Sequence, residues 1–231
     1  MAAAPVPGCL VEFGVYQGHG LCALARLARR YLPDVPPIYG FDSFAGMPAS
    51  SQPLTGALAK FWAPGTFSDT SQGRVEARLH REGVEAKLVP GVFSDLRPLG
   101  EYGIDKVRFA NLDGDVYEGY RDALRLLTPY LQVGTILRFD ESIPPNEWRY
   151  QSVREHGQRA VREWEQSTGI NLHLIRFEWT AALCVIVDED YLRRYWRLID
   201  RLRKDTVGES LRNIVRSVLR KELEERVHLR D

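Results

Sequence analysis

The chain has 231 residues, and its 31 basic and 31 acidic side chains give a formal net charge of zero at pH 7. Balanced charge offers no general attraction for nucleic acid or anionic membranes, which favours a small neutral acceptor as the partner. Cys9, Cys22 and Cys184 are too few and too far apart for a disulfide framework or a zinc site. No apolar run reaches the roughly 20 residues of a membrane helix, and the opening MAAAPVPG does not resemble a signal peptide. We therefore expect a cytosolic protein of essentially one domain.

Short apolar runs alternate with helical periodicity, which predicts an α/β fold: a mostly parallel sheet with helices on both faces. The last two runs are separated only by Glu178, Trp179 and Thr180, too few residues for a helical crossover. They should therefore form an antiparallel pair at one end of the sheet. The seven predicted strands are residues 9–13, 37–41, 86–89, 106–112, 133–139, 171–177 and 181–187.

The first predicted strand leads into a glycine-rich turn, VEFGVYQGHG, and then into a helical segment. Its glycines do not have the G-x-G-x-x-G spacing of a dinucleotide-binding turn. Gly14 and Gly18 would let a ligand lie against the backbone, and Glu12 could accept hydrogen bonds or pair with a cation. These features suit the amino-acid end of S-adenosylmethionine better than a pyrophosphate. A turn that only packs the strand on the helix is the alternative interpretation.

Asp42 ends the second predicted strand, where a doubly wound sheet places a carboxylate that binds ribose hydroxyls. NAD and S-adenosylmethionine both contain a ribose, so Asp42 does not distinguish them. The glycine spacing and the antiparallel end of the sheet favour S-adenosylmethionine. The long connection that follows, residues 43–73, carries several aromatic side chains and is either a lid or binding loop, or a surface insertion with a small core of its own.

Acidic residues follow the fourth and fifth predicted strands, in NLDGDVYEGY and LRFDES. Ligands of open α/β sheets bind outside the carboxyl ends of the strands, so these acids are candidates for chemistry. Asp115 and Glu118 have the spacing of a capping box, which assigns Asp115 mainly to a helix start. The other three acids, Asp113, Asp140 and Glu141, either bind a hard cation such as Mg²⁺ or are solvated loop residues.

Methyl transfer to an alcohol requires an acceptor oxygen that is aligned with the sulfonium methyl and relieved of its proton. A bound cation could orient the hydroxyl and lower its pKa, and a carboxylate could take the proton. Asp113 is our candidate catalytic residue, either as the base or as a metal ligand. Arg138 lies on the same face of its strand as Asp140 and could pair with an acid.

The segments VEFGVYQGHG, YGFDSFAGMP, PGTFSDT, LVPGVFSD, NLDGDVYEGYRDAL and FDE resemble the macrocin O-methyltransferase family, over roughly residues 9–190. The resemblance implies a Rossmann-like class I methyltransferase domain at residues 1–190. It implies magnesium-dependent O-methylation of a sugar, or of a sugar-bearing secondary metabolite of the kind found in antibiotic pathways. The implied metal ligands are Asp113, Asp140 and Glu141, and the implied cofactor-binding residues are Glu12, Gly14, Tyr16, Gly18, Asp42, Ser43, Phe93, Ser94 and Asp113.

The acceptor site is less well defined by the sequence. Only residues 1–8 precede the first predicted strand, where the family usually has helices that cover the acceptor. The pocket would then be built by residues 43–73, by residues 142–150 with Trp148 and Tyr150 as aromatic walls, or by a second subunit. Residues 191–231 have helical apolar periodicity and predict an extension that packs on the domain or on a second subunit of a homo-oligomer.

Other functions remain open at this point. Within enzymes, the acceptor could be a phenol or a catechol, whose hydroxyl needs less help with deprotonation. In a different class, the chain could bind S-adenosylmethionine without transferring methyl groups and act as a partner protein. A nicotinamide-dependent oxidoreductase is a weaker alternative.

Overall fold

The computed structural model describes residues 6–51, 55, 59–141, 151–177, 181–194 and 197. The chain divides into two compact units, Met1–Val187 and Asp188–Asp231. In the second unit, the helical residues 189–194 begin after Asp188, whose Oδ1 accepts a hydrogen bond of 2.6 Å from the Tyr191 amide. Trp148, Tyr150 and most of the predicted extension at 191–231 lie outside the described residues.

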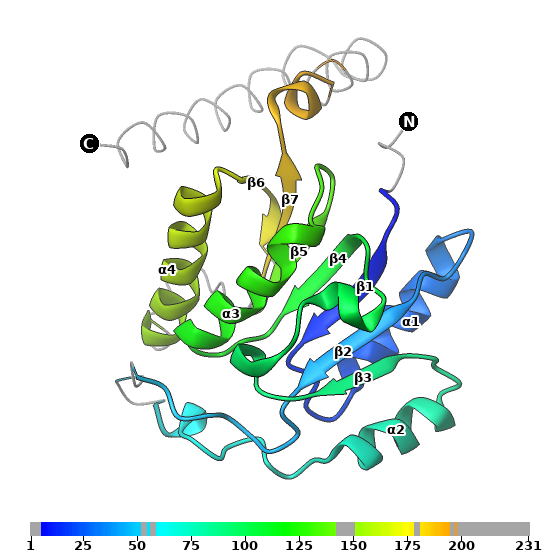
Figure 1. Cartoon of the computed structure of the whole chain (residues 1–231), viewed down its shortest axis with the longest axis vertical. Coiled ribbons are helices and arrows are strands. Elements are labelled where there is room, and N and C mark those ends of the chain that lie inside the picture. The colour runs from blue at the N-terminus through cyan, green and yellow to red at the C-terminus, as the bar shows by residue number, and fades with distance from the viewer. Residues whose placement is uncertain are drawn as a thin grey trace, which may run out of the picture. The chain divides into compact units, whose positions relative to one another are not determined.

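The first unit is built on a seven-stranded sheet in the order β3-β2-β1-β4-β5-β7-β6 (Figure 1). Strand β7 pairs antiparallel with both β5 and β6, whereas the pairs among β1 to β5 are parallel. The prediction of an α/β fold with an antiparallel pair at one end of the sheet is therefore confirmed. The strands are β1 Cys9–Phe13, β2 Ile38–Asp42, β3 Lys87–Pro90, β4 Val107–Leu112, β5 Ile136–Phe139, β6 Asn171–Phe177 and β7 Ala182–Val187.

Helices cover both faces of the sheet, and each face has its own core. On one face, α1 (His19–Tyr31) and α2 (Gln72–Arg81) bury residues such as Leu21 and Val75 against the sheet. On the other face, α3 (Tyr117–Leu127) and α4 (Gln151–Thr168) pack with Tyr120 and Trp164 in the core. Short 3-10 segments lie at Ala59–Trp62, Phe93–Asp95, Leu99–Tyr102 and Thr128–Tyr130.

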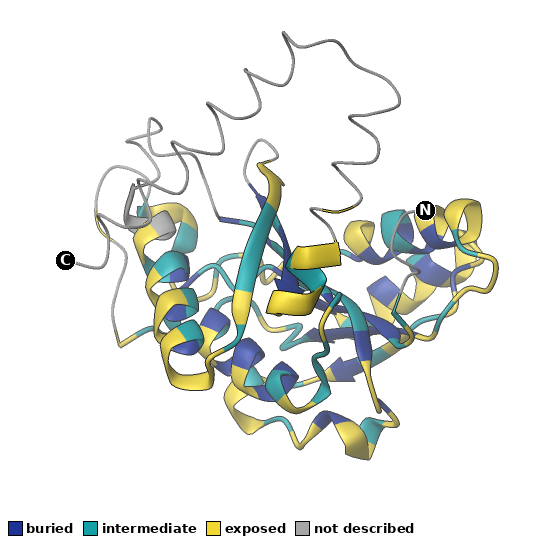
Figure 2. Ribbon diagram, turned by 90° about the horizontal axis from the view of Figure 1, so that it is seen from above, coloured by how far each residue is buried: buried dark blue, intermediate teal, exposed yellow. Residues whose placement is uncertain are grey.

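Seen from above, the strands of the sheet are mostly buried, whereas the outer sides of the helices are exposed (Figure 2). This pattern agrees with the amphipathic periodicity from which the helices were predicted. Within the described part of the chain, no helix combines the length and the apolar character that crossing a bilayer would require. The sheet therefore forms the buried centre of the first unit, and the loops at its carboxyl edge carry most of the predicted site residues.

Candidate active site at the carboxyl edge of the sheet

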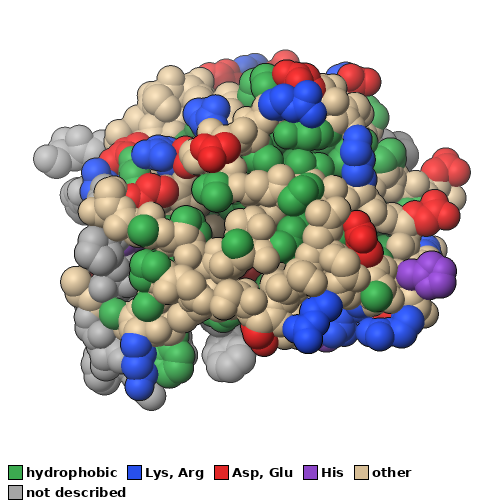
Figure 3. Space-filling model, turned by 60° about the horizontal axis from the view of Figure 1, so that its bottom comes forward, with side chains coloured by type: hydrophobic (Ala, Val, Ile, Leu, Met, Phe, Trp, Pro, Cys, Tyr) green, Lys and Arg blue, Asp and Glu red, His purple; other side chains and the backbone are tan. Residues whose placement is uncertain are grey.

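A cavity of about 190 Å³ lies at the carboxyl ends of β1, β2 and β4. In Figure 3, the bottom of Figure 1 is turned forward, and hydrophobic side chains are exposed across the middle of that face among polar ones. Six of the residues predicted to bind the cofactor line the cavity: Gly14, Tyr16, Asp42, Ser43, Phe93 and Asp113. The structure thus brings together residues from four separate parts of the sequence.

The glycine turn leaves the end of β1 in a conformation that requires glycine at Gly14. Its φ is 89°, and a Cβ added there would lie 2.2 Å from the carbonyl oxygen of Asp113. Gly18 also has a positive φ, of 82°, but a Cβ there would meet Val75 of α2. Gly14 therefore borders the cavity, whereas Gly18 allows α1 and α2 to pack closely and does not line the cavity.

Asp42 organises the backbone around the cavity. One oxygen of its carboxylate accepts hydrogen bonds from the amides of Val15 (2.7 Å) and Tyr16 (2.8 Å), and the other accepts one from the amide of Phe44 (2.7 Å). A single side chain thereby holds the glycine turn and the start of the loop after β2 in fixed positions. The predicted ribose contact would have to use the remaining acceptor capacity of this carboxylate.

Glu12 lies beneath the glycine turn and does not line the cavity. Its side chain is only 4% exposed, and its Oε1 accepts a hydrogen bond of 2.9 Å from Nδ2 of Asn111. Its other oxygen, Oε2, is buried without a hydrogen-bond partner among the described residues. Burial raises the pKa of Glu12 to about 7, although the hydrogen bond from Asn111 acts in the opposite direction. This position differs from the direct contact with a cationic ligand that the sequence predicts.

The remaining predicted cofactor residues differ in their positions. Ser43 lines the cavity, and its hydroxyl donates to the carbonyl of Gly46 at 3.0 Å. Phe93 also lines the cavity and packs edge to face on Phe13, with the ring centroids 5.2 Å apart. Ser94 does not line the cavity, and its hydroxyl donates to Asp95. An apolar wall for an adenine is therefore available at Phe93 and not at Ser94.

Three acids meet at the edge of the cavity: Asp113, Asp115 and Glu141 each offer an oxygen within 4.8 Å of the others. Burial, followed by the neighbouring negative charges, raises the pKa of all three carboxyls. The pKa of Asp115 rises to about 6 and that of Glu141 to about 8, and the pKa of Asp113 is raised well above its usual range. Burial and mutual repulsion thus disfavour the simultaneous ionisation of these carboxyls.

The capping-box prediction for Asp115 is wrong. Helix α3 has Val116 at its N-cap position, and no side chain caps it. The backbone of Asp115 is left-handed, with φ 57°, and its Oδ1 accepts a hydrogen bond of 2.7 Å from Nε1 of Trp62. Because the chain turns sharply before α3, the side chain of Asp115 points to the acidic cluster instead of the helix.

Glu118, the other half of the predicted box, also has a different role. Its carboxylate accepts hydrogen bonds from Ser50 and Ser51 of the loop after β2. Burial opposes ionisation of Glu118, but these hydrogen bonds outweigh it and lower its pKa to about 2. Glu118 is therefore an anchor for the long loop.

Glu141 is held by Tyr120, a fully buried residue of α3. The Tyr120 hydroxyl donates to Oε2 of Glu141 and accepts a hydrogen bond of 3.1 Å from the Glu141 amide. The sequence analysis did not identify Tyr120 as a residue of the site. The signal that could have identified it is a tyrosine at a core position of that helix, because a buried phenol needs a hydrogen-bond partner.

Asp140 is placed differently from the other predicted metal ligands. Its Oδ1 lies 2.7 Å from Nη2 of Arg138 in a partly buried ion pair. Asp140 is not one of the three acids that come within 4.8 Å of one another. The acid expected to pair with Arg138 is thus identified as Asp140.

The long loop at 43–73 borders the cavity through Met47, Pro48 and Phe67. Besides the contacts made by Trp62, Ser50 and Ser51, the hydroxyl of Tyr16 donates to Asp69 of this loop at 2.6 Å. The Tyr16 and Phe67 rings also pack edge to face, with centroids 5.4 Å apart. These contacts favour the binding-loop interpretation over an insertion that packs only on itself.

Backbone strain is concentrated at the same place. Among the described residues, the non-glycine residues with positive φ are Tyr16, Phe44, Phe67 and Asp115. Three of them line the cavity, and Phe44 directly follows two residues that do. Strained backbone persists where surrounding contacts hold it, and it is most frequent at functional sites.

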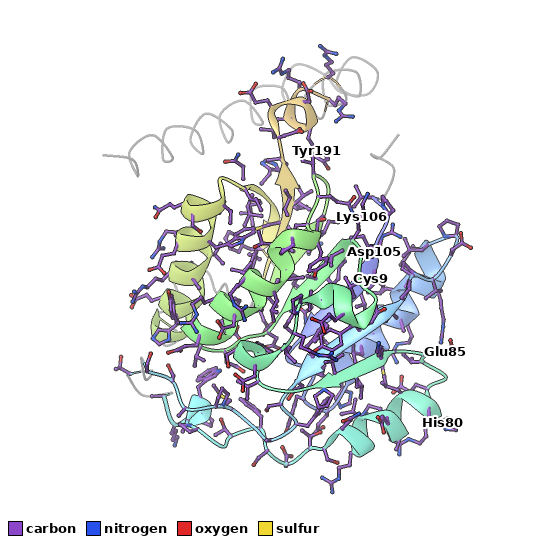
Figure 4. All side chains as sticks on the ribbon, viewed as in Figure 1. Cys9, His80, Glu85, Asp105, Lys106 and Tyr191 are labelled. Carbon is purple, nitrogen blue, oxygen red and sulfur yellow. The ribbon has the colours of Figure 1, made fainter. Side chains whose placement is uncertain are left out.

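A second hollow lies at the opposite edge of the sheet, where Cys9, Asp105 and Lys106 are labelled in Figure 4. It is lined mainly by the starts of strands and by loops that contain none of the predicted site residues. Ligands of open α/β sheets bind at the carboxyl edge, so the first cavity is the candidate active site.

The strand order and the reversed β7 define the class I methyltransferase fold, which two solved structures share. The O-methyltransferase NovP superposes with a TM-score of 0.64 at 23% sequence identity, covering 79% of this chain and 73% of NovP. The calicheamicin methyltransferase CalS11 superposes with a TM-score of 0.58 at 27% identity, covering 79% of this chain and 74% of CalS11.

The chain belongs to the Macrocin-O-methyltransferase (TylF) family, whose model matches residues 1–184. A curated relative is the 8-demethyl-8-(2,3-dimethoxy-alpha-L-rhamnosyl)-tetracenomycin-C 4'-O-methyltransferase of Streptomyces olivaceus. The two are 30% identical over 142 residues, which cover 59% of this chain. The chain spans about half of that relative's length, 53%.

Proposed function

We propose that this protein transfers a methyl group from S-adenosylmethionine to a hydroxyl of a sugar or of a sugar-bearing secondary metabolite, assisted by Mg²⁺. The observation that carries the proposal is the single cavity in which the glycine turn, Asp42 and the acidic residue Asp113 meet. The family to which the chain belongs, and the sugar-modifying activity named for the Streptomyces olivaceus relative, support the choice of a sugar hydroxyl. The proposal therefore specifies the chemical class of the acceptor.

The cofactor would occupy the part of the cavity formed by Gly14, Tyr16, Ser43 and Phe93. Gly14 presents bare backbone there, and Phe93 offers an aromatic wall for the adenine. Asp42 fixes the turn through its backbone hydrogen bonds, so the surface that receives the cofactor exists before binding. Preorganisation of this kind favours alignment of the methyl group with an acceptor.

The donor chemistry of the acidic cluster fits a hard divalent cation. Three carboxylate oxygens within 4.8 Å of one another are the ligands that Mg²⁺ prefers, and they leave positions for water or substrate. When bound, Mg²⁺ supplies an electrophilic anchor that orients the acceptor hydroxyl and lowers its pKa. Asp113, whose own pKa is raised by burial and neighbouring acids, either takes the hydroxyl proton or holds the cation.

The direct test uses the purified full chain with a panel of acceptors. Deoxysugar glycosides, nucleotide-linked deoxysugars, and simple phenols and catechols are each incubated with S-adenosylmethionine, and methylated products are measured by mass spectrometry. Methylation of a sugar acceptor is expected. Methylation confined to phenols would replace the sugar assignment, and no turnover with any acceptor would favour a partner protein that only binds the cofactor.

The role of Asp113 is tested by Asp113→Asn. This variant should reduce methyl transfer by about 100-fold or more, because it removes both a base and a ligand charge. Calorimetric titration should show that it still binds S-adenosylhomocysteine, and that the parent binds S-adenosylmethionine and not NAD. The matched control is Asp105→Asn, a change at the opposite edge of the sheet, which should leave transfer unchanged.

A further inference from the structure

A row of hydrogen-bonded polar side chains crosses three strands beneath the candidate site. Glu12 of β1 pairs in register with Asn111 of β4, which pairs in register with Arg138 of β5. Side chains at equivalent positions of neighbouring strands project from the same face of a sheet. Nδ2 of Asn111 donates to Glu12 at 2.9 Å, and Nη1 of Arg138 donates to Oδ1 of Asn111 at 2.7 Å. Arg138 is therefore held from one side by the sheet.

The other side of the Arg138 guanidinium holds Asp140. Nη2 of Arg138 lies 2.7 Å from Oδ1 of Asp140, and the two side chains are only 27% and 26% exposed. Arg138 thus uses two different nitrogens for Asn111 and Asp140, which restricts its own rotation. A partly buried ion pair of this geometry is screened less by solvent than a surface pair. The carboxylate of Asp140 is consequently oriented towards Arg138.

An oxygen of Asp115 lies within 4.8 Å of oxygens of Asp113 and Glu141. Its left-handed backbone and its hydrogen bond from Trp62 direct its side chain to Asp113 and Glu141. That hydrogen bond occupies Oδ1, so Oδ2 can face a cation. Strain at a non-glycine residue, held by a specific side-chain contact, indicates that this orientation has a function.

We propose that Arg138 is a positioning residue that keeps Asp140 out of the cation-binding set, so that Asp113, Asp115 and Glu141 are the ligands. This inference rests on the proposed function, since it specifies how the cation of that reaction is held. It departs from the ligand set that the family resemblance implies, because Asp115 replaces Asp140. The guanidinium also offsets the charge of Asp140, which would otherwise add a fourth uncompensated negative charge near the cation.

The test is direct binding of Mn²⁺, used in place of Mg²⁺, measured by electron paramagnetic resonance on the full chain without cofactor or acceptor. Asp115→Asn is expected to weaken Mn²⁺ binding about tenfold or more, because a charged ligand is lost. Asp140→Asn is expected to change it less than about threefold, because exposed or paired charges near a site act weakly. Asp105→Asn is the control for a lost negative charge away from the site.

Arg138 is tested by a double-mutant cycle. Arg138→Met releases Asp140, so Mn²⁺ should bind more tightly than to the parent, and adding Asp140→Asn should return the affinity to the parent value. Arg138→Lys keeps a positive charge beside Asp140 and is the control, which should bind Mn²⁺ with an affinity close to that of the parent. If the methionine variant does not fold, the comparison of Asp115→Asn with Asp140→Asn carries the test. Melting curves and calorimetry with S-adenosylhomocysteine establish that each variant is folded.

Two results would overturn the inference. One is a loss of Mn²⁺ binding in Asp140→Asn as large as that in Asp115→Asn, which would make Asp140 a ligand. The other is a parent protein that does not bind Mn²⁺. In that second case, methyl transfer that persists in EDTA would preserve the proposed methyltransferase function without its cation, whereas no transfer under any condition would remove that function as well.

Discussion

Nε1 of Trp62 donates a hydrogen bond of 2.7 Å to Oδ1 of Asp115, joining the long loop after β2 to the acidic cluster. The two residues are far apart in the sequence, and no pattern in it links them. Because Asp115 is partly buried, this hydrogen bond replaces solvent at one of its oxygens. The bond also favours the ionised form of Asp115, opposing the effect of burial on its pKa.

The change Trp62→Phe keeps an aromatic ring but removes this donor. We expect the free energy of unfolding to fall by about 1–3 kcal/mol, since a partly buried acceptor is left without this hydrogen bond. Urea denaturation would measure it. Phe61→Leu is the matched control, because Phe61 is 52% exposed, and a change there should stay within about 0.5 kcal/mol. Equal losses in the two variants would show that the hydrogen bond contributes nothing specific.

The effect of Mg²⁺ on thermal stability should depend on pH. Burial and mutual repulsion raise the pKa of Asp115 to about 6 and that of Glu141 to about 8, and a cation binds only the deprotonated carboxylates. As pH rises through these values, fewer protons compete with the cation. We expect the rise in Tm caused by Mg²⁺ to be larger at pH 8.5 than at pH 6, measured by scanning fluorimetry.

The control for this prediction is Asp113→Asn, which removes one ligand and should reduce the Mg²⁺ effect at both pH values. A Tm increase that is the same at pH 6 and pH 8.5 would contradict the prediction. A Mg²⁺-induced rise in Tm that is no larger in the parent than in Asp113→Asn would also contradict it.

Glu12 should make its own contribution to the pH dependence of stability. Its pKa rises from 4.5 to about 7 on folding, because burial disfavours the charged form. A raised pKa means that the folded state binds the proton more tightly than the unfolded state does. The stabilisation that protonated Glu12 contributes is therefore fully present below about pH 4.5 and is lost as pH rises towards 7. In Glu12→Gln, the fall in unfolding free energy across this window should be smaller, by the order of 1–3 kcal/mol.

Urea denaturation at several pH values, without cofactor or cation, would measure the Glu12 contribution. An identical pH slope in Glu12→Gln and the parent would mean that folding does not raise the pKa of Glu12.

Gly14 and Gly73 offer a paired test of the glycine turn. Gly14→Ala forces a Cβ to within 2.2 Å of the Asp113 carbonyl oxygen at a φ of 89°, so it should destabilise the protein severely or prevent folding. Gly73→Ala lies in α2, where a Cβ meets nothing within 4 Å, and should stabilise by up to about 1 kcal/mol. Thermal melts of the two variants would check this, and a Gly14→Ala protein as stable as the parent would refute the conformation assigned to the turn.

Much of the fold was predictable because it depends on local patterns. The strands at β1 and β6 match their predicted bounds, since apolar runs bordered by turn residues identify buried strands. Strand β5 begins later than predicted, at Ile136, because Gly134 adopts a φ of 95° in a turn that the apolar pattern could not reveal. Periodicity identifies which elements exist, but turn geometry decides where they begin.

The sequence by itself determined the class of fold, the edge of the sheet that carries the candidate site and the kinds of residues found there. Glycines before a helix, a carboxylate after β2 and acids after β4 and β5 meet at one edge because parallel strands all end on the same side of the sheet. Only the tertiary structure decided which of those side chains contact one another. Asp115 joins the acidic cluster, Asp140 pairs with Arg138, and Glu12 is buried beneath the turn. Such choices depend on distances between separate segments, and spacing within one segment does not carry that information.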